Sequence, residues 1–142
     1  MNTTLEFCLA LHRANASLQL KLDDELGTFH GINFNDFALL SLLAQADGGQ
    51  ISISELVRPL GLRQSAVLRQ LIVLEKIGLV AREGANGDRQ AVLRPAGRAL
   101  VNAARETADG ICTGAVASIA PVLVATVSAA MVALARSPSL AL

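Results

Sequence analysis

Polar and basic side chains gather on one face of a predicted helix in the segment GLRQSAVLRQL, residues 61–71. Val67, Leu71 and Leu74 recur at intervals of four and three residues, so they predict the buried side of this helix. The side chains that we expect on the outward side are Arg63, Gln64, Ser65, Leu68, Arg69 and Gln70. Glutamine can pair with adenine, arginine can pair with guanine, and an apolar side chain can contact the thymine methyl group. These residue types at this spacing indicate contact with double-stranded DNA, with Arg63 at the helix start suited to a phosphate.

A second group of arginines surrounds a glycine-rich turn in LVAREGANGDRQAVLRPAG, residues 79–97. The Asn-Gly pair of this turn is a strong hairpin signal, with LVARE and RQAVLR as the two strands. Arg89 follows the turn, and an arginine at a hairpin tip can reach into a narrow minor groove of DNA. Arg82 on the first strand and Asp88 complete the candidate DNA-binding set. We expect Asp88 to hold Arg89 in position when DNA is absent.

Charge is distributed unevenly along the chain, although its formal net charge is zero. Residues 1–57 carry two basic and seven acidic side chains, whereas residues 58–98 carry eight basic and three acidic ones. A positive segment within a neutral chain is typical of a region that contacts nucleic acid. Hydrophobic residues make up 52% of the sequence and charged residues 17%. This composition excludes disorder and predicts more apolar surface than one small domain can cover, so we expect a partner subunit.

The first two helices are predicted from apolar spacing and capping residues. Residues 4–26 read as one long helix, and Gly27 is placed just past its expected end. Asn33 then opens a second helix, because its side chain can accept a hydrogen bond from a first-turn N–H group. Asp36, at the third position of this helix, is favoured there by the helix dipole.

A helix-turn-helix follows in the middle of the chain. The isoleucines of QISIS can begin a short strand, and Ser52 with Glu55 forms a predicted capping box for a third helix. This short helix is expected to end near Gly61, and the next helix begins two or three residues later and runs to Gly78. Two helices joined by a tight glycine-containing turn are typical of a helix-turn-helix. The hairpin directly behind it completes the order of a winged helix.

The C-terminal part of the sequence is predicted to be helical and apolar. One helix starts at Pro95 and is expected to continue to residue 120, and Pro121 begins the last helix. The 26 residues 110–135 carry no charge, which is long enough to span a bilayer, since a span needs about 20. Their many alanines, the proline within the run and the missing aromatic flanks favour helices buried between subunits. A membrane-anchored interaction protein that uses residues 110–135 is the alternative.

Taken in order, these elements resemble the multiple-antibiotic-resistance regulator (MarR) family of bacterial winged-helix repressors. INFNDFALLSLLA is similar to the family's second helix, and SISELVRPLGLRQSAVLRQLIVLEKIGLVARE is similar to its helix-turn-helix and first wing strand. LRPAGRAL is similar to its exit into the fifth helix. The resemblance implies a mainly α fold with a small β-hairpin wing, in an obligate homodimer that binds a pseudo-palindromic operator. Residues 4–32 and 95–142 would form the dimerisation helices, and residues 33–94 the DNA-binding winged helix-turn-helix.

The sequence departs from the family pattern at three places. Asp88 and Arg89 are adjacent, whereas the family separates them by one residue, and the wing is shorter. Arg63 stands where the family has a serine or threonine cap at the start of the recognition helix. Arg94 stands where a threonine is usual.

The resemblance also implies an effector that releases the DNA. Family members commonly respond to a small phenolic or aromatic acid or to oxidation of a cysteine. The candidate ligand-binding residues are His12, Arg13, His30, Phe37 and Leu40. FCLALH is similar to the first helix of the organic-hydroperoxide-sensing branch, with Cys8 at the reactive position, but the sequence has no tyrosine to stabilise a thiolate. We therefore expect Cys8 to be an ordinary buried thiol and the protein to be a repressor released by a small aromatic or phenolic ligand. A redox-sensing regulator that uses Cys8 is the alternative.

The sequence contains no motif typical of an enzyme or of a metal-binding protein. Two cysteines make neither a disulfide framework nor a metal site. Paired carboxylates, H-E-x-x-H, G-x-S-x-G and a phosphate-binding glycine loop followed by lysine are all missing. We therefore expect no catalytic site, no metal and no cofactor. The N-terminal segment lacks the basic region and cleavage pattern of a signal peptide, so we expect a cytoplasmic protein without a membrane partner.

Overall fold

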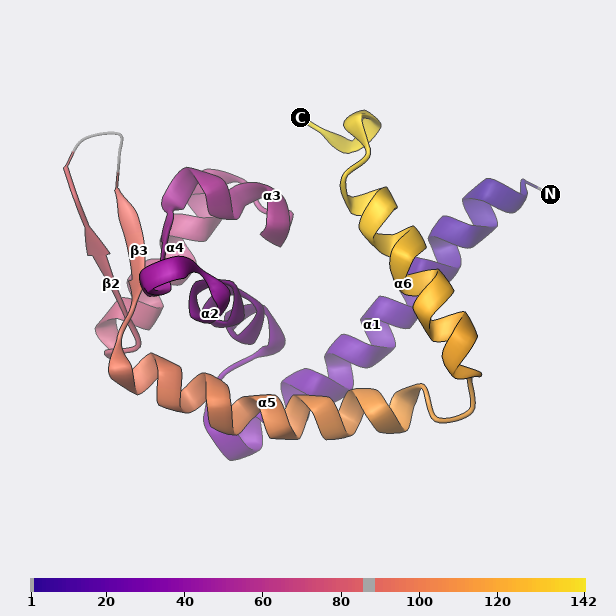
Figure 1. The fold of residues 1–142 in the computed structure, drawn as a ribbon, viewed down its shortest axis with the longest axis horizontal. Helices are drawn as coiled ribbons and strands as arrows, with labels where there is room; N and C mark the ends of the chain where they lie inside the picture. Colours follow the sequence, from indigo (N-terminus) through magenta and orange to yellow (C-terminus); the bar gives the residue numbers. More distant parts are fainter. Residues whose placement is uncertain (1, 86–88) are drawn as a thin grey trace.

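A winged helix-turn-helix is joined to two long helices and a separate C-terminal helix in the computed structural model, which describes residues 2–85 and 89–142 (Figure 1). The α-helices are α1 (Thr3–His30), α2 (Phe34–Gln45), α3 (Val57–Leu60), α4 (Gln64–Lys76), α5 (Pro95–Ala115) and α6 (Pro121–Ala135). The strands are β1 (Gln50–Ser52), β2 (Val80–Glu83) and β3 (Gln90–Leu93), and short 3₁₀ turns are η1 (Asp47–Gly49), η2 (Ile53–Leu56) and η3 (Pro138–Leu140). The predicted fold class, mainly α with a small hairpin wing, is confirmed.

Helix α1 is longer than predicted, because it passes through Gly27 instead of ending there. A single glycine costs a helix only about 1 kcal/mol relative to alanine, and buried Leu22 and Leu26 hold this part of α1 against the core. The helix ends at His30, and its C-cap is Gly31, whose φ of 71° is the left-handed conformation that glycine adopts without strain. The N–H group of Gly31 donates to the carbonyl of Gly27 at 3.1 Å.

The predicted cap of α2 is confirmed, whereas the predicted cap of α3 is wrong. Asn33 accepts from the N–H group of Asp36 at 2.8 Å, and the Asp36 carboxylate accepts from the N–H group of Asn33 at 3.1 Å. Ser52 makes no capping bond, since it belongs to β1 and a 3₁₀ turn intervenes before α3. Its hydroxyl instead lies 3.1 Å from that of Ser54. Helix α3 ends at Leu60 with Gly61 as its C-cap, as expected.

The three strands form an antiparallel sheet in the order β1-β3-β2. Strands β2 and β3 make the wing, with Val80 opposite Leu93 and Glu83 opposite Gln90. Strand β1 pairs with the other edge of β3 and places Gln50 opposite Val92. The two predicted strands of the hairpin are therefore confirmed. The predicted turn at residues 86–87 lies outside the described residues.

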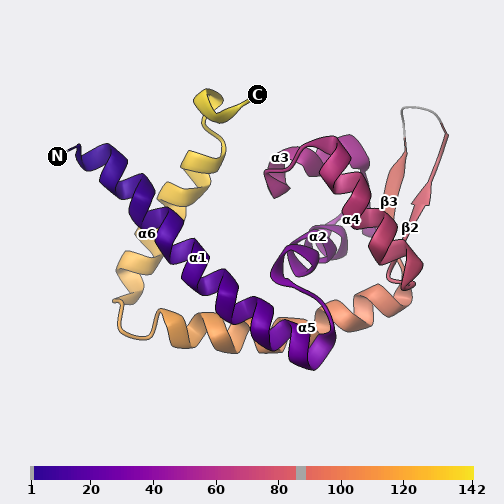
Figure 2. The same cartoon turned by 180° about the vertical axis from the view of Figure 1, so that it is seen from behind.

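One hydrophobic core joins the winged helix to α1 and α5. Its largest fully buried side chains are Leu22, Leu26, Leu39, Leu40, Leu43, Leu56, Val67, Leu71, Leu74, Val80 and Val101. Helix α5 begins directly behind the wing and runs to the opposite end of the molecule, and α1 packs across it (Figures 1 and 2). At the start of α5, Gly97 is buried against Leu79, whose carbonyl accepts from the N–H group of Arg94 at 3.0 Å.

Helix α6 stands apart from this core. The predicted start at Pro121 is confirmed, but α5 ends at Ala115 and not at residue 120, because residues 116–120 turn the chain into α6. No residue of α6 is buried, although the helix is almost entirely apolar; Val122 is 70% exposed and Leu123 is 53% exposed. None of the described helices combines the length and the apolar character that crossing a bilayer requires.

Candidate nucleic-acid interface

The outward side of α4 carries polar and basic groups. Gln64, Ser65 and Arg69 are exposed, while Val67 and the other two predicted core residues of the helix are fully or almost fully buried. Arg63 is the exposed N-cap residue, and its side chain makes no capping bond, so its guanidinium is not used by the helix start. Among the described residues, no carboxylate lies within ion-pair distance of Arg63 or Arg69. This side of the helix is therefore available to an external partner.

Leu68 does not lie fully on this outward face. It is half-buried and packs against the hydrophobic core, because it sits at the edge of the helix nearer to the buried side. Two apolar side chains that we did not single out, Ile72 and Val73, are exposed one turn beyond Arg69, at 36% and 58%. The spacing of Ser65, Arg69 and Ile72 already placed the last of these on the same helical face.

Arg82 is held within the protein by Glu75. Its Nη2 and Nε atoms donate to Glu75 Oε1 at 3.0 and 3.1 Å, and its backbone N–H group donates to Glu75 Oε2 at 3.2 Å. The side-chain hydrogen bond from Arg82 is the main reason that the pKa of Glu75 is lowered. This arginine therefore fastens β2 to α4, whereas the sequence prediction placed it at the DNA surface.

Gln70 is also engaged within the protein. Its Nε2 atom donates to Asp36 Oδ1 at 3.1 Å, so its side chain turns toward the start of α2. Gln70 is half-buried, unlike its neighbour Arg69. Sequence periodicity placed Gln70 beside the outward face but carried no information about Asp36, which is far away in the chain.

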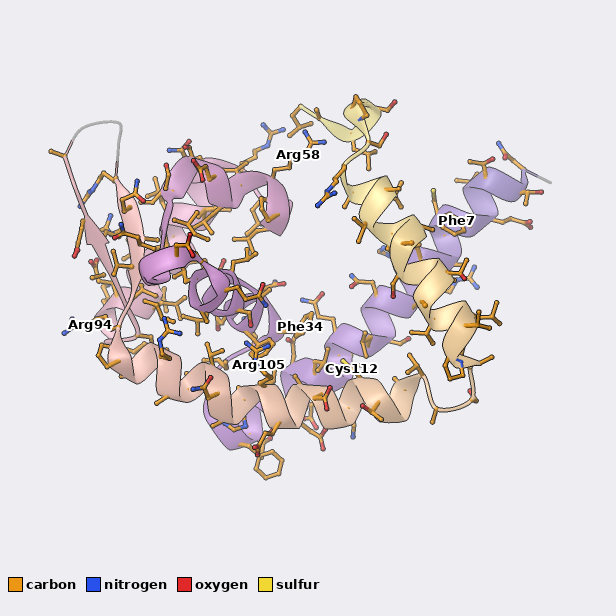
Figure 3. All side chains as sticks on the ribbon, viewed as in Figure 1. Phe7, Phe34, Arg58, Arg94, Arg105 and Cys112 are labelled. Atoms are coloured by element: carbon orange, nitrogen blue, oxygen red, sulfur yellow. The ribbon has the colours of Figure 1, made fainter. Side chains whose placement is uncertain are left out.

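Arg89 is exposed at the start of β3, and its carbonyl accepts from the N–H group of Ile53 at 3.0 Å. The predicted role of Asp88 falls on a residue outside the described part of the chain. Further exposed arginines, among them Arg58 and Arg94, lie on the same half of the molecule. Arg94 projects from the junction of β3 and α5, and Arg58 on α3 lies near the C-terminal segment, 3.4 Å from the carbonyl of Ser137 (Figure 3).

The five predicted ligand-binding residues are not brought together. Leu40 is fully buried in the core, and Phe37 is half-buried with its ring stacked on Phe34 at a centroid distance of 6.1 Å. His30 is half-buried, and its Nε2 atom lies 2.8 Å from the hydroxyl of Thr107, which joins the end of α1 to α5. His12 and Arg13 are exposed on α1, away from these groups.

A groove of about 900 Å³ lies between α1 and α5. It is mainly apolar, with Leu18, Ile111 and Val116 among its walls and Lys21 and Glu106 among its charged groups. None of the five predicted ligand-binding residues lines it. The sequence signal that we missed was the small residues Gly110 and Gly114, whose lack of side chains leaves space beside α1.

The two cysteines differ in environment. Cys8 is exposed on α1, so the expectation of a buried thiol is wrong for the single chain. Cys112 on α5 is half-buried, and burial together with the nearby charge of Asp109 raises its pKa. Across residues 2–85 and 89–142, histidine, cysteine and carboxylate side chains form no cluster of three that could hold a metal ion.

A helix-turn-helix with a polar and basic second helix, followed by a hairpin wing, defines a winged-helix DNA-binding protein. The comparison with protein families agrees, because residues 30–91 match the model of the MarR family. This match and the fold comparison confirm the resemblance to the MarR family of transcriptional regulators that was seen in the sequence. Members of this family are generally DNA-binding proteins without enzymatic activity. A search of curated proteins gave no match.

Several solved structures share the whole fold. AbsC, a MarR family transcriptional regulator from Streptomyces coelicolor, is 22% identical with a TM-score of 0.81 over 96% of this chain and 95% of its own. Sco3205 from the same organism, solved in complex with DNA, is 21% identical with a TM-score of 0.84 over 98% and 92%. CouR from Rhodococcus jostii RHA1, solved with p-coumaroyl-CoA, is 17% identical with a TM-score of 0.85 over 93% of each chain. At these identities the likeness establishes the fold.

Proposed function

We propose that the protein is a homodimeric transcriptional repressor that binds a pseudo-palindromic operator in double-stranded DNA. The main support is the outward side of α4, where Arg63, Gln64, Ser65 and Arg69 are exposed. A second recognition element is the exposed Arg89 of the wing. Leu68, Gln70 and Arg82 are left out of this surface, since each is engaged with other parts of the protein.

The homodimer is supported by the apolar surface that one chain leaves uncovered. Helix α6 exposes Val122, Leu123, Val127 and Val132, each by half or more of its surface. Soluble monomers rarely expose contiguous apolar patches of this kind, so we expect a second copy of the chain to cover this surface. We expect a dimer in sedimentation equilibrium, and a monomer at all concentrations would contradict this part of the proposal.

The effector that we propose is a small aromatic or phenolic acid. The mainly apolar groove between α1 and α5 can take an aromatic ring. Among its lining residues, Lys21, whose ammonium lies 3.9 Å from Glu25 Oε1, can pair with the carboxylate of a ligand. The structure of the fold relative CouR contains p-coumaroyl-CoA, a thioester of a phenolic acid. Redox control through Cys8 remains the alternative, and its exposed position makes it accessible to peroxide in the single chain. Release of operator DNA by aromatic acids but not by peroxide supports the ligand, and the reverse supports the alternative.

The decisive experiment measures DNA binding at a series of salt concentrations. Fluorescence anisotropy reports the binding, and the duplexes come from the region upstream of the coding sequence. Each phosphate contact adds about 0.9 to the slope of log affinity against log salt, so Arg63→Ala should reduce that slope by about one. Arg69→Ala should weaken operator binding by about tenfold, because a good arginine–guanine pair is worth about 1–3 kcal/mol. Arg105→Ala is the matched control, since Arg105 is an exposed arginine on α5 (Figure 3). Equal and weak binding to every duplex would refute the proposed function.

A further inference from the structure

Helix α4 is held by two polar contacts, one on each flank of its buried side. Gln70 donates to Asp36 of α2 at 3.1 Å, and Glu75 binds Arg82 of β2 at 3.0 Å. At 100° per residue, positions 70 and 75 lie about 140° apart on the helix, with the buried leucine at position 71 between them. The two contacts therefore brace the helix from opposite sides, and the outward side that carries Arg69 faces away from both.

The carboxylate of Asp36 takes part in two hydrogen bonds, one of which is the contact with Gln70. Its Oδ2 atom accepts from the N–H group of Asn33 in the capping box, and its Oδ1 atom accepts from Gln70. The same end of α2 is bonded to α1, because Asp23 Oδ1 accepts from the N–H group of Phe34 at 2.7 Å. A continuous set of hydrogen bonds thus runs from α1 through the first turn of α2 to α4.

Hydrogen bonds supply what the apolar contacts of α4 lack. Burial of Val67, Leu71 and Leu74 determines which side of the helix faces the core, but the hydrophobic effect has no preferred direction and does not fix the finer rotation about the helix axis by itself. A hydrogen bond needs a short distance and a nearly linear arrangement, so it fixes that rotation. Gln70 is adjacent to Arg69, and its bond to Asp36 consequently sets the direction in which Arg69 projects.

On the basis of the DNA-binding function proposed above, we propose that Gln70 and Asp36 are positioning residues for operator recognition. Their hydrogen bond fixes the rotation of α4 and so directs Ser65 and Arg69 toward the base edges. Through Asp23, the same hydrogen bonds connect the orientation of α4 to α1. Neither residue needs to touch DNA in this role. It differs from the role that the sequence suggested for Gln70, which was direct contact with a base.

The test compares the affinity of variants for a preferred operator, for each single base-pair change in one half-site, and for random duplex. Gln70→Met keeps the length of the side chain and removes the donor. We expect it to lower the ratio of operator to random-duplex affinity by about fivefold to tenfold, as the net loss of one hydrogen bond predicts. The loss of discrimination should spread over several base pairs, and the salt slope on random duplex should stay unchanged because the phosphate-binding arginines remain.

Two further variants complete the experiment. Gln19→Met is the control, because Gln19 of α1 donates to Asn35 of α2 at 3.3 Å in an exposed bond between side chains that does not involve α4. It should leave the discrimination profile unchanged. Asp36→Asn should reproduce the effect of Gln70→Met from a different helix, because one amide oxygen cannot serve both hydrogen bonds of the carboxylate.

The outcomes are distinguishable. Loss of discrimination at a single base pair would mean that Gln70 reads a base directly, and an unchanged profile would mean that the contact with Asp36 does not aim the helix; either result overturns this inference. The proposed function survives both of these results. It fails only if the unmodified protein binds all duplexes equally, and the positioning role then fails with it.

Discussion

Replacing Gly97 with alanine should destabilise the protein, although alanine is the better helix former. An added Cβ at Gly97 would meet the carbonyl oxygen of Leu79 well inside van der Waals contact and would lie 2.7 Å from Leu93 Cδ1. The gain in helix propensity is about 1 kcal/mol, whereas overpacking typically costs about 1–3 kcal/mol. We place the cost at the upper end, because the Leu79 carbonyl also accepts from Arg94 and belongs to the backbone between α4 and the wing. The expected net loss is about 2 kcal/mol.

This prediction is checked by thermal unfolding at one fixed protein concentration, since association of subunits would shift the melting temperature. Gly97→Ala should lower the melting temperature by roughly 5–10 °C. Gly27→Ala is the matched control, because Gly27 lies inside α1 and its added Cβ would meet no atom within 4 Å. This control should raise the melting temperature through helix propensity alone. If Gly97→Ala melts at or above the unmodified protein, the tight contact between α5 and the segment before β2 is not present in solution.

Two further predictions concern titratable groups. Glu75 has a lowered pKa in the folded protein, so its ion pair contributes stability at neutral pH that is lost as the pH falls through its folded pKa. Urea unfolding from pH 7 to pH 3 measures the difference in unfolding free energy between the unmodified protein and Glu75→Gln. This difference should shrink in acid, and a constant difference would contradict the prediction. Cys112 has a raised pKa because of burial and the charge of Asp109. In a Cys8→Ser background, Asp109→Asn should therefore speed alkylation of Cys112 at pH 7.5, by at most a few-fold because burial remains, and an unchanged rate would show that the carboxylate does not act on this thiol.

Local sequence signals predicted much of the architecture. The spacing of Val67, Leu71 and Leu74 identified the buried side of α4, and Asn33 and Pro121 marked two helix starts. These signals work because helix periodicity and capping depend on residues within one or two turns. Local signals failed at three places. Burial of neighbouring leucines carries α1 through Gly27, Ser52 does not cap α3, and α5 ends at Ala115 and not at residue 120.

The partners of polar side chains could not be predicted in the same way. Gln70 and Asp36 are separated by 34 positions, and His30 and Thr107 by 77, so only the assembled fold brings each pair together. Periodicity indicates which face a side chain occupies but not which element lies opposite. For that reason the set of arginines in the sequence contained both exposed residues such as Arg69 and an internally paired one.

Helix α5 has a mechanical consequence for any signal that arises at the α1–α5 groove. It is one continuous helix of 21 residues, about 31 Å long, with the wing joined to its first turn and the groove beside its last turns. If the helix moves as a rigid body, a tilt of its axis by about 5° about one end displaces the other end by about 3 Å. This displacement is close to the rise of one base pair, about 3.4 Å. A small tilt of α5 at the groove would therefore become a displacement of nearly one base-pair rise at the wing.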